Sequence, residues 1–209
     1  MPLALRDILA KGPVIPVVTI ADASAGPDLA RALLDGGISV IEVTMRTPAA
    51  LDAVRAIRDA VPDMVAGVGT LLDPHRIPAV LASGAQFAVS PGLDVDLVKA
   101  CQAAGLPILP GIQTVSEAMA ARRAGLDTLK FFPAKSAGGP GALAQIRPVL
   151  PELVFCPTGG IGAQDAADYL ALENVLCVGG SFPAPNAAIQ ARDWEAVRAN
   201  AALANALGG

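Results

Sequence analysis

The stretch LKFFPAK, residues 129–135, is short and apolar, and a proline interrupts it at Pro133. This pattern is typical of a buried strand that ends at the proline. The strand carries a charged residue, Lys130, between Leu129 and Phe131. Burying an unpaired ammonium is costly, whereas a desolvated lysine that loses its proton becomes a nucleophile near neutral pH. Lys130 is therefore a candidate catalytic residue, and a lysine whose end reaches solvent from the strand end is the alternative.

The same alternation of a short apolar segment with a helical one extends outward from this strand in both directions. Besides the lysine strand, we predict strands at 14–20, 38–44, 64–68, 86–89, 107–109, 153–156 and 175–178. We predict a short N-terminal helix at 3–10 and helices at 27–37, 48–60, 74–83, 94–104, 115–124, 140–150, 163–172 and 192–207.

Strands that are buried on both faces appear in a sequence as continuous apolar runs, which is what a parallel sheet requires. Eight strand–helix units predict an α/β fold, a closed (β/α)8 TIM barrel, with residues 1–209 forming a single domain. A doubly wound open sheet is the alternative, but no GxGxxG motif follows the first predicted strand.

Composition excludes several classes of protein. The net charge is −4 and no basic stripe is visible, so we expect no nucleic-acid partner. No apolar run approaches about 18 residues, so we expect no membrane span, and residues 1–12 are a poor signal peptide. The three cysteines are unclustered and odd in number, which favours a reducing compartment and thiols packed as small hydrophobes. We therefore predict a cytoplasmic protein.

The active site of a barrel is built from the carboxyl ends of its strands. In the segment SVIEVTMRT, residues 39–47, a period of two puts Glu42, Thr44 and Arg46 on one face. If that face points inward, a carboxylate lies inside the barrel and an arginine at its mouth, while Thr70 ends the third strand. A purely structural ion pair between Glu42 and Lys130 is the alternative. Buried pairs stabilise poorly compared with apolar packing, so two ionisable groups in a barrel core favour function.

Glycines cluster after the last two strands. The seventh strand is followed by PTGGIG, residues 157–162, and the eighth by GGS, residues 179–181. The loops after strands seven and eight are the usual phosphate site of barrels, because backbone N–H groups there can face an anion. One such pair also makes ordinary turns, but two pairs at these two positions predict a phosphate site.

Metal and hydrolase chemistry find no support in the sequence. The one histidine, His75, follows Asp73-Pro74 at a predicted helix start, and no HxH, HExxH or CxxC motif occurs. No GxSxG motif occurs either. We therefore expect neither a metal nor another cofactor.

Seven motifs together resemble a known family. They are IEVTMRT (41–47), GVGT (67–70), FAVSPG (87–92), PGIQTVSE (110–117), LKFFPA (129–134), FCPTGGI (155–161) and LCVGGS (176–181). In this order and at these spacings they resemble the 2-keto-3-deoxy-6-phosphogluconate (KDPG) aldolases, class I lyases of the Entner–Doudoroff pathway. These enzymes often also act on 2-keto-4-hydroxyglutarate (KHG). The resemblance covers residues 12–181. It implies a (β/α)8 barrel, a homotrimer, no metal, and cleavage of KDPG to pyruvate and glyceraldehyde 3-phosphate.

The resemblance also implies a role for each matching residue. Lys130 matches the Schiff-base lysine and Glu42 the general acid/base. The residues that match the family's substrate-binding positions are Arg46 and Thr70 at the pyruvyl carboxylate, Pro91 and Phe132 at the pocket wall, and Thr158, Gly159, Gly160, Gly179, Gly180 and Ser181 at the phosphate.

Three positions depart from the family pattern and bear on substrate preference. Lys135 stands where the family usually has an acid, Gln113 where a small residue is common, and Phe182-Pro183 in place of a pair that usually contains Trp.

Three other functions are alternatives. They are a phosphosugar isomerase or epimerase, which needs no reactive lysine, a phosphogalactonate-type aldolase, and a phosphosugar-binding protein without catalysis.

Overall fold

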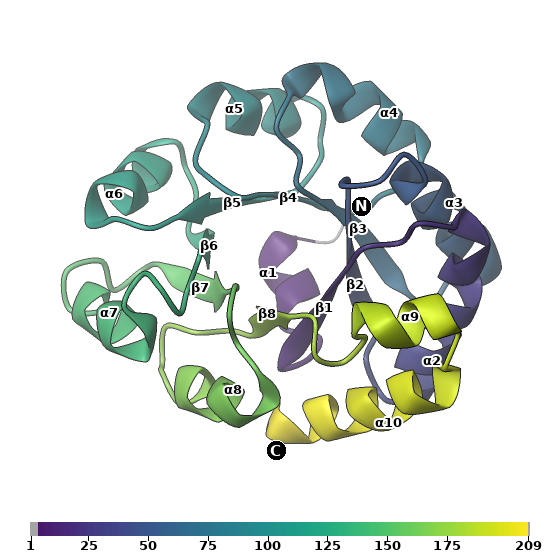
Figure 1. The fold of residues 1–209 in the computed structure, drawn as a ribbon. Coiled ribbons are helices and arrows are strands. Elements are labelled where there is room, and N and C mark those ends of the chain that lie inside the picture. Colours follow the sequence, from purple (N-terminus) through teal and green to yellow (C-terminus); the bar gives the residue numbers. More distant parts are fainter. Residues whose placement is uncertain (1–3, 209) are drawn as a thin grey trace.

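Eight parallel strands form a ring in this computed structural model, which describes residues 4–208 (Figure 1). The strands are β1 (Val14–Val18), β2 (Val40–Thr44), β3 (Val65–Gly69), β4 (Ala88–Ser90), β5 (Ile108–Ile112), β6 (Thr128–Phe131), β7 (Val154–Pro157) and β8 (Val178–Gly180). Their order is β7-β6-β5-β4-β3-β2-β1-β8. Isolated bridges from Phe155 to Val175 and from Thr158 to Gly179 join the two ends. The predicted (β/α)8 barrel is confirmed.

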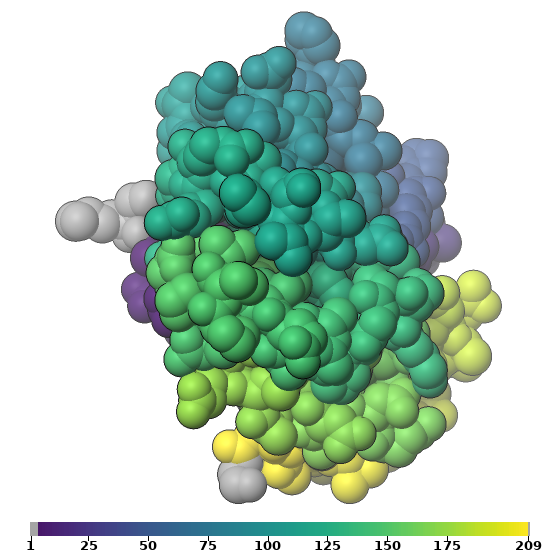
Figure 2. Space-filling view, turned by 90° about the vertical axis from the view of Figure 1, so that its left-hand side faces the viewer, coloured from purple at the N-terminus to yellow at the C-terminus, as the bar shows by residue number. Residues whose placement is uncertain are grey.

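The helices cover the outer face of the ring, except α1 (Leu5–Leu9), which lies across the amino ends of the strands (Figure 1). The other helices are α2 (Gly26–Asp35), α3 (Ala50–Ala60), α4 (Ile77–Ala82), α5 (Val95–Ala103), α6 (Val115–Arg123), α7 (Gly139–Ile146), α8 (Ala163–Leu170), α9 (Asn186–Ala191) and α10 (Trp194–Asn205), with 3-10 turns η1 (Ala23–Ala25), η2 (Pro74–Arg76) and η3 (Ala206–Gly208). Seen from the side, α6, α7 and α8 form a continuous surface in teal and green (Figure 2). No helix within residues 4–208 is both long and apolar enough to cross a membrane.

Side-chain caps fix where several helices begin. The Asp94 carboxylate accepts the N–H groups of Asp96 and Leu97 at the start of α5. Thr114 and Glu117 form a reciprocal capping box at the start of α6. These caps satisfy backbone donors that the first helical turn leaves unpaired.

Several predicted element limits differ from the structure. Residues 110–112 continue β5 instead of ending it, and Pro110 pairs with Ser90 of β4. The eighth strand is Val178–Gly180, not 175–178, so its two glycines belong to the strand. The helix α9 was not predicted, because a six-residue segment is too short to show helical periodicity. The predicted first helix began at Leu3, outside the described residues, and is observed from Leu5.

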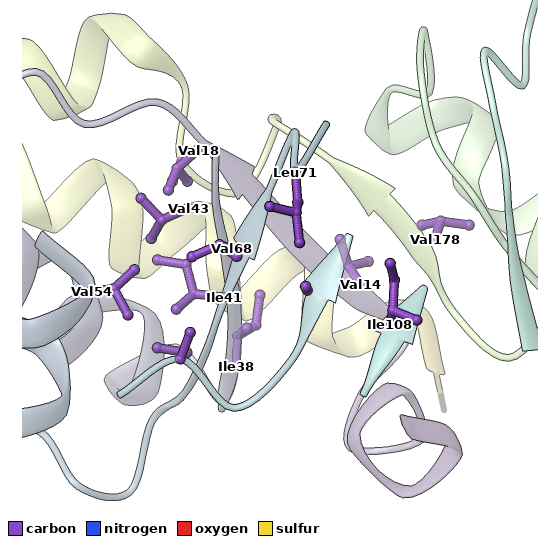
Figure 3. Close-up of a cluster of buried hydrophobic side chains, with 14 of the residues drawn as sticks. Val14, Val18, Ile38, Ile41, Val43, Val54, Val68, Leu71, Ile108 and Val178 are labelled. Carbon is purple, nitrogen blue, oxygen red and sulfur yellow. The ribbon is translucent and has the colours of Figure 1, made fainter. Parts of the chain in front are cut away.

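The larger apolar cluster lies between the strands and the helices. Outward-facing side chains of the strands, such as Ile41, Val43 and Val68, pack there with helix residues such as Val54 of α3 (Figure 3). Burying one such aliphatic side chain contributes about 1.5–3 kcal/mol. This shell holds the strands in place around the interior.

A second apolar cluster fills the amino-terminal half of the barrel interior. It contains Ile15, Val40, Val65, Val89, Leu109 and Cys156 from the strands, Phe87 and Cys177 from the residues just before β4 and β8, and Ile8 and Leu9 from α1. In Figure 1, α1 appears within the ring, where it covers the amino ends of the strands. A side chain at Gly67 would overlap the ring of Phe87, so the glycine makes room for this packing.

Candidate active site

Lys130 and Glu42 meet inside the barrel. Their strands, β6 and β2, lie on opposite sides of the ring, and Lys130 Nζ lies 3.7 Å from Glu42 Oε1. The two side chains are only 7% and 5% exposed. Lys130 Nζ also lies 5.2 Å from the centroid of the Phe132 ring, within the range of a cation–π contact. The predicted inward direction of both side chains is confirmed.

Glycines on the neighbouring strands make room for Glu42 and for the Pro91 backbone beside the pair. A Cβ atom at Gly69 of β3 would overlap Glu42 Oε1, so the carboxylate lies directly over the glycine. Gly111 of β5 is the register partner of Lys130, and a Cβ atom there would overlap the carbonyl of Pro91. Our sequence reasoning did not assign these two glycines to the site. The available signal was a glycine inside a strand, which often marks a close approach.

Thr44 faces inward two residues beyond Glu42, as the period of two predicts. Its hydroxyl donates to the carbonyl of Val18 at 2.9 Å and lies 2.9 Å from Thr19 Oγ1. These bonds tie the carboxyl ends of β1 and β2 together. Thr19 was missed because a threonine at a strand end carries no distinctive pattern.

The two residues predicted for the substrate carboxylate lie at the carboxyl-terminal mouth. Arg46 is exposed just after β2 and forms no ion pair with any residue in 4–208. Thr70 follows β3 with a φ of +62°. A left-handed conformation at a β-branched residue costs about 1–3 kcal/mol and is characteristic of functional sites. Neither residue contacts the Lys130–Glu42 pair directly through a hydrogen bond or ion pair within the described residues.

The two glycine pairs lie side by side. Thr158 is buried, forms a bridge with Gly179, and would overlap a Cβ atom there. Gly159 and Gly160 have φ values of +102° and +75°, which side chains disfavour. The strand ends therefore bring PTGG and GGS together, with Ser181 exposed at the end of β8. A Cβ atom at Gly180 would lie 2.8 Å from the Phe182 ring, so this departure from the family pattern packs against the glycine.

Two cysteines, Cys156 and Cys177, lie in the barrel interior near the charged pair. Cys156 is the register partner of Lys130, and all three cysteines are free and buried. A hydrogen bond from Cys177, with the charge of Lys130, lowers the pKa of Cys156 despite burial. Donating that bond raises the pKa of Cys177 well above its ordinary value. Burial alone raises the pKa of Cys101 to about 11. The interpretation of these thiols as packed small hydrophobes is confirmed.

Other parts of the described chain lack this chemistry. A cleft of about 540 Å³ lies at the amino end, between α1, α8 and the end of the chain, but no ionisable residue lines it. His75 is exposed at the start of η2. No group of three or more His, Cys, Asp or Glu side chains within residues 4–208 could hold a metal ion. The candidate site is therefore the carboxyl-terminal half of the barrel interior.

The sequence profile of the KDPG and KHG aldolases matches residues 5–200. The KHG/KDPG aldolase of Escherichia coli strain K12 is 46% identical over 192 residues, which cover 92% of this chain and 90% of the relative. The chain belongs to the KDPG and KHG aldolase family.

Solved structures of KDPG aldolases agree with this assignment. The enzyme from Legionella pneumophila, with pyruvate captured as a covalent carbinolamine, superposes with a TM-score of 0.93 at 41% identity, covering 96% of this chain and 97% of that one. The enzyme from Zymomonas mobilis ZM4 with 3-phosphoglycerate superposes with a TM-score of 0.91 at 39% identity, covering 96% and 94%. Aldolases are lyases, so the Lys130–Glu42 geometry is interpreted as the centre of a lyase.

Proposed function

We propose that this chain is a class I aldolase that cleaves KDPG to pyruvate and glyceraldehyde 3-phosphate. The observation that carries the proposal is the buried Lys130–Glu42 pair, held 3.7 Å apart inside an apolar barrel. An ion pair without a catalytic role would give no gain in stability here, since apolar side chains of similar size stabilise a core as well or better. A Schiff-base aldolase, in contrast, needs an amine nucleophile beside a group that can exchange protons.

In the first half of the reaction, Lys130 forms a covalent bond with the substrate. The neutral Nζ attacks the C2 ketone and gives a carbinolamine, which loses water to form an iminium. A carbinolamine with pyruvate is the species captured in the Legionella pneumophila relative. The positively charged iminium can accept the electron pair of the C3–C4 bond, which prepares that bond for cleavage.

In the second half, Glu42 moves the protons. Its carboxylate, directly or through a water, removes the proton of the C4 hydroxyl, and the C3–C4 bond breaks to release the aldehyde. The electron pair of that bond forms an enamine on Lys130. Glu42 returns a proton to C3, and water hydrolyses the resulting iminium to pyruvate and free Lys130.

The remaining predicted residues hold the substrate in our proposal. Arg46 binds the pyruvyl carboxylate, preferably with both arms of its guanidinium, and Thr70 lies beside it. Pro91 and Phe132 form the walls. The backbone N–H groups of the glycine pairs, with Thr158 and Ser181, receive the phosphate, whose binding energy orients the reacting carbons. The phosphoglycerate bound to the Zymomonas mobilis relative supports a phosphorylated acid as ligand.

Three finer points also belong to the proposal. The chain cleaves 4-hydroxy-2-oxoglutarate to pyruvate and glyoxylate as a second activity, which the double name of the Escherichia coli relative supports. It works as a homotrimer in the cytoplasm. It needs no metal, so turnover should be unchanged in EDTA. A lactate dehydrogenase-coupled assay of pyruvate release separates KDPG, its galactonate-type epimer and 4-hydroxy-2-oxoglutarate as substrates.

Covalent trapping tests the proposal. Incubation with pyruvate and borohydride should add one reduced pyruvyl group per chain, on Lys130. Lys130→Ala should abolish both the label and turnover. Lys135→Ala is the matched control and should keep the label, because Lys135 is 67% exposed and lies outside the interior. An adduct mapped to Lys135, or no adduct at all, would remove the mechanism.

A further inference from the structure

We propose that Lys135 is a positioning residue that favours phosphorylated substrates by neutralising Asp165 beside the glycine loop, residues 159–162. The inference rests on the proposed function. Lys135 is also a position at which this chain departs from the usual family pattern, so its role does not follow from family membership.

The backbone and stem of Lys135 are fixed against the glycine loop. Its N–H donates to the carbonyl of Gly159 at 3.1 Å. Its Cβ lies 2.9 Å, and its Cδ 3.3 Å, from the position that a Cβ atom would take at Gly160. The lysine side chain therefore packs along the open face of Gly160.

The ammonium of Lys135 pairs with Asp165. Lys135 Nζ lies 3.4 Å from Asp165 Oδ2, and the N–H of Gly162 donates to the same oxygen at 3.3 Å. Asp165 is thus held at the loop by a backbone donor, and its side chain is only 34% exposed. Lys135 is the cation among the residues that line a groove of about 360 Å³ here, and Asp165 and Asp168 are the carboxylates.

This arrangement has an electrostatic consequence for a phosphate. Asp165 would repel a phosphate dianion that approaches the N–H groups of Gly159 and Gly160. Pairing with Lys135 cancels this charge near the loop. The benefit applies to the phosphorylated end of a substrate and not to the reacting carbons, so it should appear in KM and not in kcat.

The test compares Lys135→Met, Asp165→Asn and the double variant on KDPG and on unphosphorylated 4-hydroxy-2-oxoglutarate. Lys135→Met should raise KM for KDPG by about 3–10-fold, a modest effect because the groups are partly exposed to water. Its kcat and its KM for the unphosphorylated substrate should stay unchanged. The double variant should return KM for KDPG to within about twofold of wild type, because Asn removes the repelling charge and can still accept from Gly162.

Controls separate this role from others. Lys99→Met, on the exposed side of α5, removes the same charge far from the loop and should leave KM unchanged. Added salt should shrink the effect of Lys135→Met. An unchanged KM in Lys135→Met overturns the inference, and so does a double variant as impaired as the single one, which would indicate direct contact with phosphate. Wild-type protein that fails to cleave KDPG would instead overturn the proposed function itself.

Discussion

The two halves of the barrel interior are built from the same strands but from different chemistry. On β2, Val40 packs in the apolar amino-terminal cluster, and two residues later Glu42 faces Lys130. Cys177, the residue just before β8, belongs to the apolar cluster, and Gly179 within β8 lies at the glycine loops. The difference teaches that a strand only five residues long can serve stability at its start and chemistry at its end.

The two halves should also respond differently to substitution. The amino-terminal half is closed by α1 and stabilised by apolar burial. The carboxyl-terminal half buries two charged groups and holds the strained, partly exposed Thr70, each of which has a cost in stability. Three substitutions test this division and a fourth, in a surface helix cap, gives a reference outside both halves; they follow in descending order of expected effect.

Lys130→Met should have the largest effect. Turnover should fall by at least about 10⁴-fold, because the nucleophile is lost. The free energy of unfolding should also fall by about 3–5 kcal/mol, since Glu42 is left buried without its partner. The double variant Lys130→Met/Glu42→Leu should recover most of this stability and none of the activity, as measured by urea unfolding and the pyruvate assay. A double variant no more stable than the single one would show that an unpaired Glu42 carboxylate has no cost to the fold.

Leu9→Ala should destabilise the closed end without changing the chemistry. Leu9 is fully buried, and its truncation should lower the free energy of unfolding by about 2–5 kcal/mol. Well below the melting temperature, kcat should match wild type. Leu203→Ala is the control, because Leu203 is 70% exposed and its loss should cost less than about 0.5 kcal/mol. A large fall in kcat for folded Leu9→Ala would mean that the two halves are coupled.

Gly69→Ala should lower the rate of catalysis without unfolding the barrel. The added methyl group would overlap Glu42 Oε1, so the carboxylate must move from its place beside Lys130. A displacement of about 1 Å can cost about 10²-fold in rate, and we expect kcat to fall by this amount while the barrel stays folded. Gly141→Ala in α7 is the matched control, because a Cβ atom there meets nothing within 4 Å. Equal kcat values for both variants would show that the position of Glu42 is not critical.

Glu117→Gln should have the smallest effect, because its polar contacts lie at the surface. The bond from the N–H of Gln113, followed by the bonds from Thr114, lowers the pKa of Glu117. A lowered pKa in the folded state gives stability that is present above the ordinary value of 4.5 and is lost as pH falls. The variant should be less stable by about 0.5–1 kcal/mol at pH 7, and the difference should shrink on acidification. Urea unfolding at several pH values measures this, and a difference that grows in acid would contradict the assignment.

The sequence was sufficient for the barrel and its charged centre, since both depend on local patterns. Continuous apolar runs identified the strands, and the period of two placed Glu42 and Thr44 on the inner face. The strand limits at Pro110 and Gly179 were wrong for a different reason. Proline and glycine normally end strands, but here Pro110 pairs in register with Ser90, and Gly179 with Ile15. The missing side chains at Gly111 and Gly179 make room for Pro91 and Thr158.

What sequence reasoning missed depends on contacts between distant segments. Gly69 is needed because Glu42 from the next strand lies over it, and Thr19 matters because Thr44 lies within hydrogen-bond distance. The local pattern shows at most a glycine inside a strand or a threonine near a strand end, and it does not identify the distant partner. The roles of Arg46, Thr70 and the glycine pairs stay predictions, supported by their position at one end of the barrel.

The junction between β7 and β8 bears on where the barrel opens locally. The ring is completed there by isolated bridges, with hydrogen bonds from Phe155 to Asn174 and from Leu176 to Phe155, in place of a continuous ladder. Regions with few ladder bonds open with a smaller free energy and exchange their amide hydrogens sooner. A phosphate held by Gly159–Gly160 on one side and Gly179–Gly180 on the other would link the two sides of this junction. Bound substrate would then slow amide exchange at Leu176, because opening the barrel at this junction would require the phosphate contacts to break.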